Sequence, residues 1–232
     1  MKTKLLIISF ILLSGAAGAQ AILKAGVNMA NVTITNDGDI DRNKSLTSFQ
    51  LGITGDVKIT SFFYFQPGIL FTGKGSKTES GDPNSSTWRK ATTNPFYVEV
   101  PANFVLKFGG DSKDKKDDDV RFFVGAGPYL GIGVAGKNKV NGKLLGTSFS
   151  SEEDITWSND DPTTLNYEEG AGYGVLKRFD YGLNGLAGIE FSKVVLGVNY
   201  GFGLAKLQSG SNSSADDKNK HRVFSVTLGI RL

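Results

Sequence analysis

Cysteine is absent from this 232-residue chain, and histidine occurs only once, as His221. The lack of cysteine excludes disulfide bonds, zinc–thiolate sites and thiol nucleophiles together. Long apolar runs are also missing, because no stretch beyond the N-terminal region approaches the roughly 20 apolar residues of a transmembrane helix. No sign of charge dominates either, since 26 basic residues face 23 acidic ones. This balance argues against a nucleic acid as partner.

Residues 1–19 have the pattern of a secretory signal peptide. Lys2 and Lys4 supply the positive start, residues 5–13 a short apolar core, and residues 17–19 a small-residue cleavage motif. The apolar core is too short to cross a bilayer as a helix. We therefore expect residues 1–19 to be a removed signal peptide and residues 20–232 to form one exported domain.

The clearest pattern that is present is a strict alternation of apolar and polar residues over residues 179–204. A two-residue turn at Ser192 and Lys193 would place Phe191 opposite Val194, and every apolar side chain would then face another one. The same register pairs Ile189 with Leu196, Leu183 with Phe202 and Gly182 with Gly203. Strands of soluble sandwiches usually run about five or six residues, and these are longer. An apolar face opposite a glycine-rich, charged face is typical of a membrane-spanning β-strand.

The same alternation recurs along the chain and predicts eight strands. They cover residues 22–32, 47–59, 63–73, 95–108, 120–134, 179–191, 194–204 and 223–232. An even number of amphipathic strands predicts an all-β fold, an eight-stranded antiparallel up-and-down transmembrane β-barrel with long extracellular loops, over residues 20–232. Closure into a ring satisfies every edge hydrogen bond in lipid. Because the connections alternate between long and short, both termini are expected to be periplasmic.

Three stretches interrupt this pattern. Pro67 lacks a backbone donor, so we expect an edge or a bulge in the third strand. Residues 74–94 and 136–177 are polar, and we expect both to be loops. The second of these is the longest irregular segment and is expected to be extracellular and the most mobile part of the chain.

The interior of an eight-stranded barrel is just wide enough for its own side chains, so we predict a plugged lumen and not an open pore. Strand parity turns eight charged side chains inward: Lys24, Asp56, Lys58, Glu99, Lys107, Asp180, Glu190 and Arg231. Isolated charges are costly in such a space, and opposite signs should therefore pair. Strand order brings Lys24 or Arg231 within reach of Glu190.

No catalytic, cofactor-binding or metal-ligating constellation emerges from the sequence. We expect His221 to be a solvated or interfacial residue at the rim, because nothing in the sequence pairs with it as a nucleophile would. Asp117, Asp118 and Asp119 lack the ligand spacing of a calcium loop and read as a solvated turn.

The glycines of residues 125–133 and the two tryptophans can be explained without a catalytic or cofactor-binding role. The glycines of residues 125–133 imitate a dinucleotide fingerprint, but no helix follows, so they are interpreted as lumen-facing glycines that give room to Tyr129 and its neighbours. Trp88 and Trp157 are expected in loops, at the membrane surface or against a partner.

Several blocks resemble the PorT-like outer-membrane β-barrel family of Bacteroidetes. They are KAGVNMANV at 24–32, FQPGILFTGKGSK at 65–77, YVEVPANFVLKF at 97–108, FVGAGPYLGIG at 123–133 and YGLNGLAGIEF at 181–191. The resemblance implies a small eight-strand barrel in the outer membrane, in a family whose named members assist secretion or maturation of exported proteins. Gly68 stands where the family often has a glutamate, so this chain lacks that carboxylate.

Two classes of function remain open. The first is a non-enzymatic, monomeric barrel surrounded by outer-membrane lipid, whose extracellular loops or periplasmic face bind a protein partner of an export or surface-assembly system. The second is a barrel enzyme or small-molecule binder with a site at the loop rim. If His221, an acid and a hydroxyl lie within hydrogen-bonding reach of one another, the second class is favoured. If these groups lie far apart, the first class is favoured. A soluble lipocalin-like barrel is disfavoured, because it would expose a continuous apolar girdle.

Overall fold

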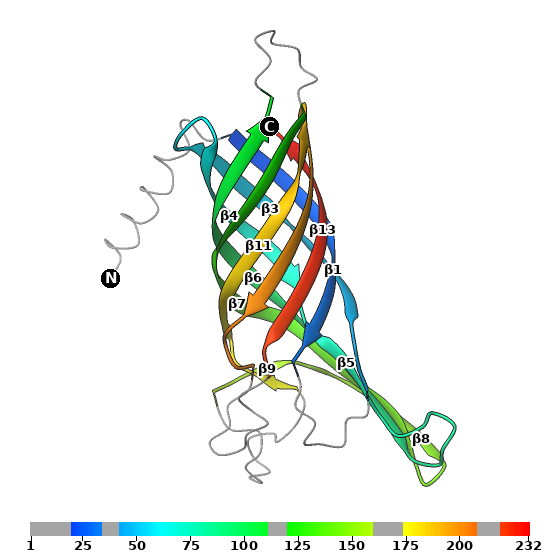
Figure 1. Ribbon diagram of the computed structural model, residues 1–232. Helices are drawn as coiled ribbons and strands as arrows, with labels where there is room; N and C mark the ends of the chain where they lie inside the picture. The colour runs from blue at the N-terminus through cyan, green and yellow to red at the C-terminus, as the bar shows by residue number, and fades with distance from the viewer. Residues whose placement is uncertain (1–19, 34–41, 111–119, 160–173, 208–218) are drawn as a thin grey trace.

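Eight strands form a closed antiparallel ring in the computed structural model, which describes residues 20–33, 42–110, 120–159, 174–207 and 219–232 (Figure 1). The ring consists of β1 (Gln20–Val32), β3 (Leu46–Lys58), β4 (Phe63–Gly73), β6 (Trp88–Gly109), β7 (Val120–Leu144), β11 (Phe179–Phe191), β12 (Val194–Gly203) and β13 (His221–Arg231). It closes between β1 and β13, where Leu23 lies opposite Ile230. The predicted fold class is therefore confirmed. The expected signal peptide, residues 1–19, lies outside the described residues.

The two ends of the barrel differ. The start of β1 and the end of β13 lie together, because the Leu232 N–H donates to the Ala21 carbonyl over 2.9 Å. We call this the terminus end, and we call the opposite end the arm end (Figure 1). In the described ranges, no helix is long and apolar enough to cross a membrane.

The hairpin of β11 and β12 has the register that the alternation predicts. Phe191 lies opposite Val194, and the pairing continues without a shift to Gly182 and Gly203. Ser192 takes a φ of 50° in the turn, a left-handed conformation that a non-glycine residue rarely adopts. The apolar pattern of the strands thus sets the register, although Ser-Lys is not a preferred turn dipeptide.

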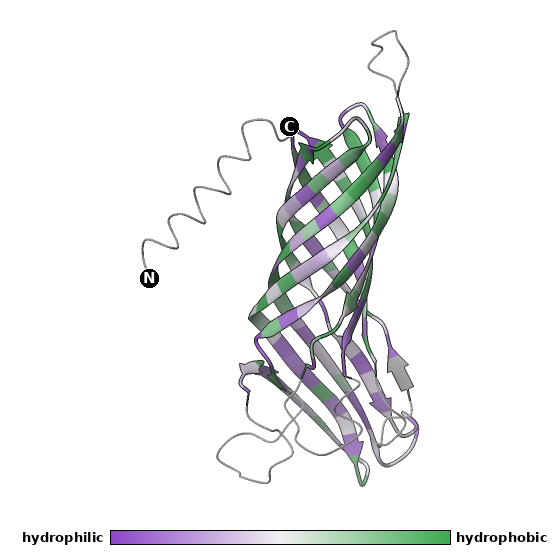
Figure 2. Ribbon diagram, turned by 60° about the vertical axis from the view of Figure 1, so that its left-hand side comes forward, coloured by the Kyte–Doolittle hydropathy of each residue, from purple (hydrophilic) through white to green (hydrophobic). Residues whose placement is uncertain are grey.

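Apolar side chains cover the outside of the ring, and hydrophobic and hydrophilic residues alternate along its strands (Figure 2). On this outer surface Phe96 stacks on Phe71 with ring centroids 5.2 Å apart and lies 5.5 Å from the ring of Phe49. This aromatic cluster lies close to the arm end, as in the girdles that flank the apolar band of membrane barrels. The shortest ring strand, β12, has ten residues, which agrees with the 9–11 residues of a tilted spanning strand.

The expectation for Pro67 is wrong. The residue lies inside the ring between β3 and β6, opposite Ala102, and it is neither at an edge nor at a bulge. The β3–β4 pairing has a gap between Thr54 and Val57, yet the register on both sides of the gap is the same. The missing N–H of proline therefore interrupts the ladder locally without adding a residue.

The two expected loops at the arm end are largely strands, which is a second correction. Residues 76–80 form β5 (Ser76–Ser80), and β6 and β7 run on past the ring as a long antiparallel pair. β8 (Thr147–Asp154) pairs with the far part of β7, and β2 (Arg42–Lys44) pairs with β5. We call this sheet of β2, β5, β8 and the far parts of β6 (88–94) and β7 (137–144) the arm. The expected mobility of residues 136–177 stays a prediction, and residues 160–173 lie outside the described residues.

A bulge marks the junction between ring and arm. Phe96 lies opposite Ala135, whereas its neighbour Tyr97 lies opposite Gly133, so β7 carries one extra residue, Val134. Such an insertion bends a strand and increases its twist. The arm consequently leaves the line of the barrel wall at this level and leans away from the barrel axis (Figure 1).

Neighbouring groups crowd one glycine of β11 and leave another free. We therefore expect different losses of stability when each is replaced by alanine. A Cβ added at Gly188 would meet the Leu196 carbonyl oxygen and the ring of Phe123, whereas nothing lies within 4 Å of a Cβ added at Gly185. We expect Gly188→Ala to destabilise the barrel by roughly 1–3 kcal/mol, the usual cost of overpacking, and Gly185→Ala to be nearly neutral. Urea unfolding in lipid vesicles, followed by gel mobility without boiling, measures both. Equal midpoints for the two variants would contradict the packing described here.

Candidate functional site in the barrel lumen

An ion-pair network fills the lumen near the terminus end. The ammonium of Lys107 contacts Asp56 and lies 2.5 Å from Glu190 Oε1. Arg231 Nη2 lies 2.7 Å from Glu190 Oε2, which confirms the predicted pair, and 3.6 Å from Asp56 Oδ2. Gln66 donates to the remaining oxygen of Asp56 over 3.0 Å. Two cations and two carboxylates thus neutralise each other, and both carboxylates are almost completely buried.

A second network fills the lumen near the arm end and is centred on Lys74. Its Nζ lies 2.7 Å from Glu99 Oε2 and 2.7 Å from Asp180 Oδ2. Tyr129 donates its hydroxyl to Asp180 over 3.2 Å, and its ring lies beneath the ammonium at 4.1 Å. Asn184 reaches Glu99 at 3.5 Å. The single ammonium therefore holds two carboxylates that come from different strands.

Lys74 was missed by the sequence analysis because it begins a stretch interpreted as a loop. It follows β4 directly, its N–H donates to the Pro95 carbonyl over 2.9 Å, and its side chain is 3% exposed. The inward parity of Tyr64, Gln66 and Thr72 in β4 continues to residue 74. This continuation was the available signal.

Opposite charges balance in the lumen. One residue of the predicted inward set is wrong, because Lys58, the last residue of β3, is exposed. Lys74 is buried in the lumen and takes its place in the set. The lumen then holds four cations and four carboxylates: Lys24, Lys74, Lys107 and Arg231 with Asp56, Glu99, Asp180 and Glu190. A buried ion pair contributes little net stability, but removing one partner from it costs roughly 3–5 kcal/mol. Pairing is therefore a condition for folding of this barrel.

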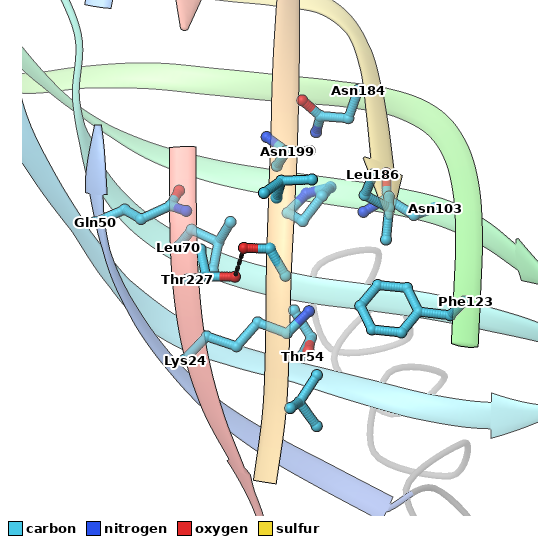
Figure 3. A pocket seen from close by; sticks show the side chains of 14 residues that line it. Lys24, Gln50, Thr54, Leu70, Asn103, Phe123, Asn184, Leu186, Asn199 and Thr227 are labelled. Atoms are coloured by element: carbon cyan, nitrogen blue, oxygen red, sulfur yellow. Dashed lines mark hydrogen bonds between the residues drawn. The ribbon is translucent and has the colours of Figure 1, made fainter. Parts of the chain in front are cut away.

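A small polar cavity separates the two networks. Lys24, Gln50, Asn103 and Asn184 are among the side chains around it, and Figure 3 shows them pointing into a common space. Its volume is about 50 Å³, enough for a few water molecules, since one needs about 10–15 Å³. Ligand pockets usually measure about 300–1,000 Å³. The cavity therefore suits hydration of polar side chains and not a small-molecule ligand.

The expectation for His221 is wrong. This residue is the first of β13, two residues before the expected start of the last strand, and it is 1% exposed and therefore neither solvated nor interfacial. Its Nε2 lies 3.3 Å from the Tyr97 hydroxyl, and the two rings meet edge to face at 5.5 Å. Asp180 does not complete a triad, because no hydrogen bond joins it to His221: Lys74 and Tyr129 bind its Oδ2, and both its Oδ1 and His221 Nδ1 are buried without a hydrogen-bond partner among the described residues. A histidine and a hydroxyl are thus brought together, but in a buried position.

A small apolar cap covers this end of the lumen. Trp157 of β9 (Thr156–Trp157) stacks edge to face on Tyr97 at 5.6 Å. β9 pairs in parallel with β10 (Val175–Leu176). Ile155, Leu176 and Leu207 are buried together, with Trp157 packed against them. The cap shields the second network from solvent. Trp157 therefore lies in a strand and against the protein, not in a loop.

Other sequence expectations have simpler outcomes. Gly133 leaves the space that the Trp157 ring occupies, in line with the interpretation of these glycines as lumen-facing. Trp88 lies in β6 and not in a loop. The residues that the structure describes include no group of three or more potential metal ligands. Asp117, Asp118 and Asp119 lie outside the described residues.

Removal of Lys74 tests the second network. We expect Lys74→Met to destabilise the folded barrel by roughly 3–5 kcal/mol, because Glu99 and Asp180 would remain buried beside each other without a cation. Lys77→Met is the matched control, since Lys77 lies on the arm, where changes typically cost within about 0.5 kcal/mol. The measurement is the urea midpoint in lipid vesicles. Equal midpoints would show that Lys74 does not hold the two carboxylates.

Solved structures of outer-membrane proteins are similar to this chain at low identity. The attachment invasion locus protein Ail of Yersinia pestis is 15% identical, with 92% of this chain and 99% of that chain covered and a TM-score of 0.38. Neisserial surface protein A is 13% identical, with coverages of 91% and 96% and a TM-score of 0.36. OprG of Pseudomonas aeruginosa is 13% identical, with coverages of 92% and 94% and a TM-score of 0.34. Because these TM-scores are low, the assignment of the fold rests on the strand pairing and not on these structures.

Comparison with curated proteins finds no match. The family described as "Outer membrane protein beta-barrel domain" matches residues 17–209, which is most of the chain. This match agrees with the closed ring of eight strands and its apolar exterior. The chain belongs to the outer membrane protein beta-barrel domain family and is an outer-membrane β-barrel protein.

Proposed function

We propose that the protein is a non-enzymatic barrel that anchors its arm at the cell surface, where the arm binds a protein partner of an export or surface-assembly system. The arm is the observation that carries this proposal. It is a sheet outside the membrane-spanning ring, built on two ring strands of 22 and 25 residues. A barrel that only had to close in lipid would not need strands of this length.

The edge of the arm offers a surface for binding. β8 is exposed along its whole length and ends the order of paired strands in the sheet. An exposed edge strand presents unpaired backbone donors and acceptors to which a partner can add a strand. The tip adds apolar side chains, with Leu145 84% exposed at a φ of 51°. A leucine in this conformation strains the backbone, and its exposed side chain lowers solubility. A partner that covers the side chain would explain why the position is a leucine.

The filled lumen favours a scaffold function over the function of an enzyme or of a small-molecule binder. The two ion-pair networks, the small cavity and the cap leave a filled interior in the described part of the chain. His221 and Tyr97 are buried, so a substrate at the loop rim would not reach them. A barrel enzyme would require a different constellation.

The proposed orientation places both termini in the periplasm and the arm outside the cell. At the terminus end β11 and β12 are joined by two residues, whereas the connections at the arm end are longer. Outer-membrane barrels have short periplasmic turns and longer extracellular loops. The resemblance to the PorT-like family of Bacteroidetes adds support for an export role, since its named members assist secretion or maturation of exported proteins.

Single cysteines test orientation and partner together, because the natural chain has none. We expect a membrane-impermeant maleimide to label Ser148→Cys, on β8, in intact cells. Lys193→Cys, in the β11–β12 turn, should react only after the outer membrane is permeabilised. A photo-activated cross-linker at each cysteine should then give a discrete adduct from position 148 and none from position 193.

Each outcome bears on a separate part of the proposal. Labelling of Lys193→Cys alone in intact cells would invert the orientation. An adduct from position 193 with none from position 148 would move the partner site to the terminus end.

A further inference from the structure

Six lysines gather on one face of the arm. In antiparallel sheets, directly opposed residues project to the same side. Across the sheet Lys44 lies opposite Lys77, Lys77 opposite Thr92, and Thr92 opposite Lys139. Alternation along the strands adds Lys90 on β6 and Lys137 and Lys143 on β7. We call this the lysine face.

The carboxylates on the same face are fewer. Glu79 lies 2.7 Å from Lys44 and 3.4 Å from Lys90, and the hydrogen bond from Lys44 lowers the pKa of Glu79. Glu152 lies 2.7 Å from Lys137 and 3.9 Å from Lys139. These contacts confirm that the side chains share one face. Asp154, opposite Lys137, is the third carboxylate, so six lysines exceed the carboxylates by three charges.

Two of the lysines have no ion-pair partner among the described residues. They are Lys77 of β5 and Lys143 of β7, and both are half-buried. Lys143 lies opposite Trp88, whose ring belongs to the same face. Lysine and tryptophan together are typical of surfaces at a membrane interface.

The lysine face continues the lipid-facing surface of the barrel. On β6 the outward parity of Phe96 passes without a shift to Asn94, Thr92 and Lys90. On β7 the extra residue at the bulge moves the outward parity from Val134 to residues 137 and 139. The bulge therefore keeps the two strands in phase, and one uninterrupted outer surface runs from the aromatic cluster at Phe96 onto the arm.

The lysine face begins close to the membrane-spanning part of the barrel. The arm leaves the ring at an angle to the barrel axis (Figure 1). Lys137 lies opposite Asn94, two residues beyond Phe96, which is roughly 7 Å along the strand. The lysine face thus begins within the headgroup layer, which is about 5–8 Å deep on each side of the hydrocarbon core.

We propose that the lysine face binds the anionic headgroups of the lipid leaflet at the arm end, with Lys77, Lys139 and Lys143 contacting their phosphate groups. This goes beyond the proposed function and rests on it only for naming the leaflet as the outer one. The contact would set the angle of the arm and leave the β8 edge free for a partner. An acidic protein is the competing occupant, but continuity with the lipid-facing surface favours lipid.

The experiment measures which face of the arm approaches the headgroups. The chain of residues 20–232 carries a nitroxide at Ser148→Cys, on the lysine face, or at Ser151→Cys, on the opposite face of β8. Each is reconstituted into nanodiscs of phosphatidylcholine, alone or mixed with phosphatidylglycerol, with a nickel-chelating lipid as relaxation agent. We expect phosphatidylglycerol to increase relaxation at position 148 several-fold and to leave position 151 nearly unchanged.

Charge variants decide whether the lysines cause the effect. In Lys77→Gln/Lys143→Gln we expect the ratio of docked to undocked arm to fall roughly thirtyfold, because each of the two lysines near an anionic surface contributes about 1 kcal/mol. Lys58→Gln/Lys193→Gln removes the same charge from exposed positions at the terminus end and should behave as wild type. About 1 M salt, where the Debye length is about 3 Å, should abolish the increase. Gel mobility without boiling confirms that each variant is folded.

Three results would overturn the proposal. Phosphatidylglycerol without effect at position 148 would show that lipid does not bind this face and would leave an acidic protein as its occupant. A larger increase at position 151 would show that the opposite face docks. Equal losses in the two double variants would attribute the effect to net charge and not to the lysine face.

Discussion

Each carboxylate inside this barrel lies within ion-pair distance of a cation, and the rest of the structure depends on that constraint. A lumen of eight strands has too little room to hydrate isolated ions, and an unpaired buried charge would cost more than a small barrel can tolerate. Three cations and four carboxylates form two separate networks, and Lys24 adds a fourth positive charge to the lumen. The paired charges come from four ring strands, β3, β6, β11 and β13, and from Lys74, which follows β4. The networks therefore join strands that do not pair directly.

The two networks also divide the molecule into a closed part and an exposed part. Near the terminus end the charges pack with the apolar lumen residues Tyr64, Val105 and Phe123. Near the arm end they lie under Tyr97, Trp157 and the cap. Because the interior is occupied, the surfaces left for recognition are the outer faces and edges at the ends of the barrel. The bulge at Val134 then produces an arm with two different surfaces, a charged outer face and an open edge.

Much of the ring could be predicted from the sequence, since a period of two is unambiguous over ten or more residues. The β11–β12 register followed from matching apolar faces, and Glu190 met Arg231 because strand order in a closed ring fixes neighbours. The arm could not be predicted in this way. Its strands are polar on both faces, as in residues 147–154, so alternation carries no signal there. Lys74 and His221 were missed for a related reason, because both lie just outside the strands that the alternation predicts. The inward parity of β4 nevertheless reaches Lys74, and β13 begins at His221.

Single-channel recording in planar bilayers tests the filled lumen most directly. The purified barrel is inserted at low concentration, and its current is recorded over a range of voltages. Paired charges and a capped lumen predict conductance at background level, without steady open steps. A large, steady channel in the wild-type protein would contradict the account, because ions would then pass through the space that the two networks occupy.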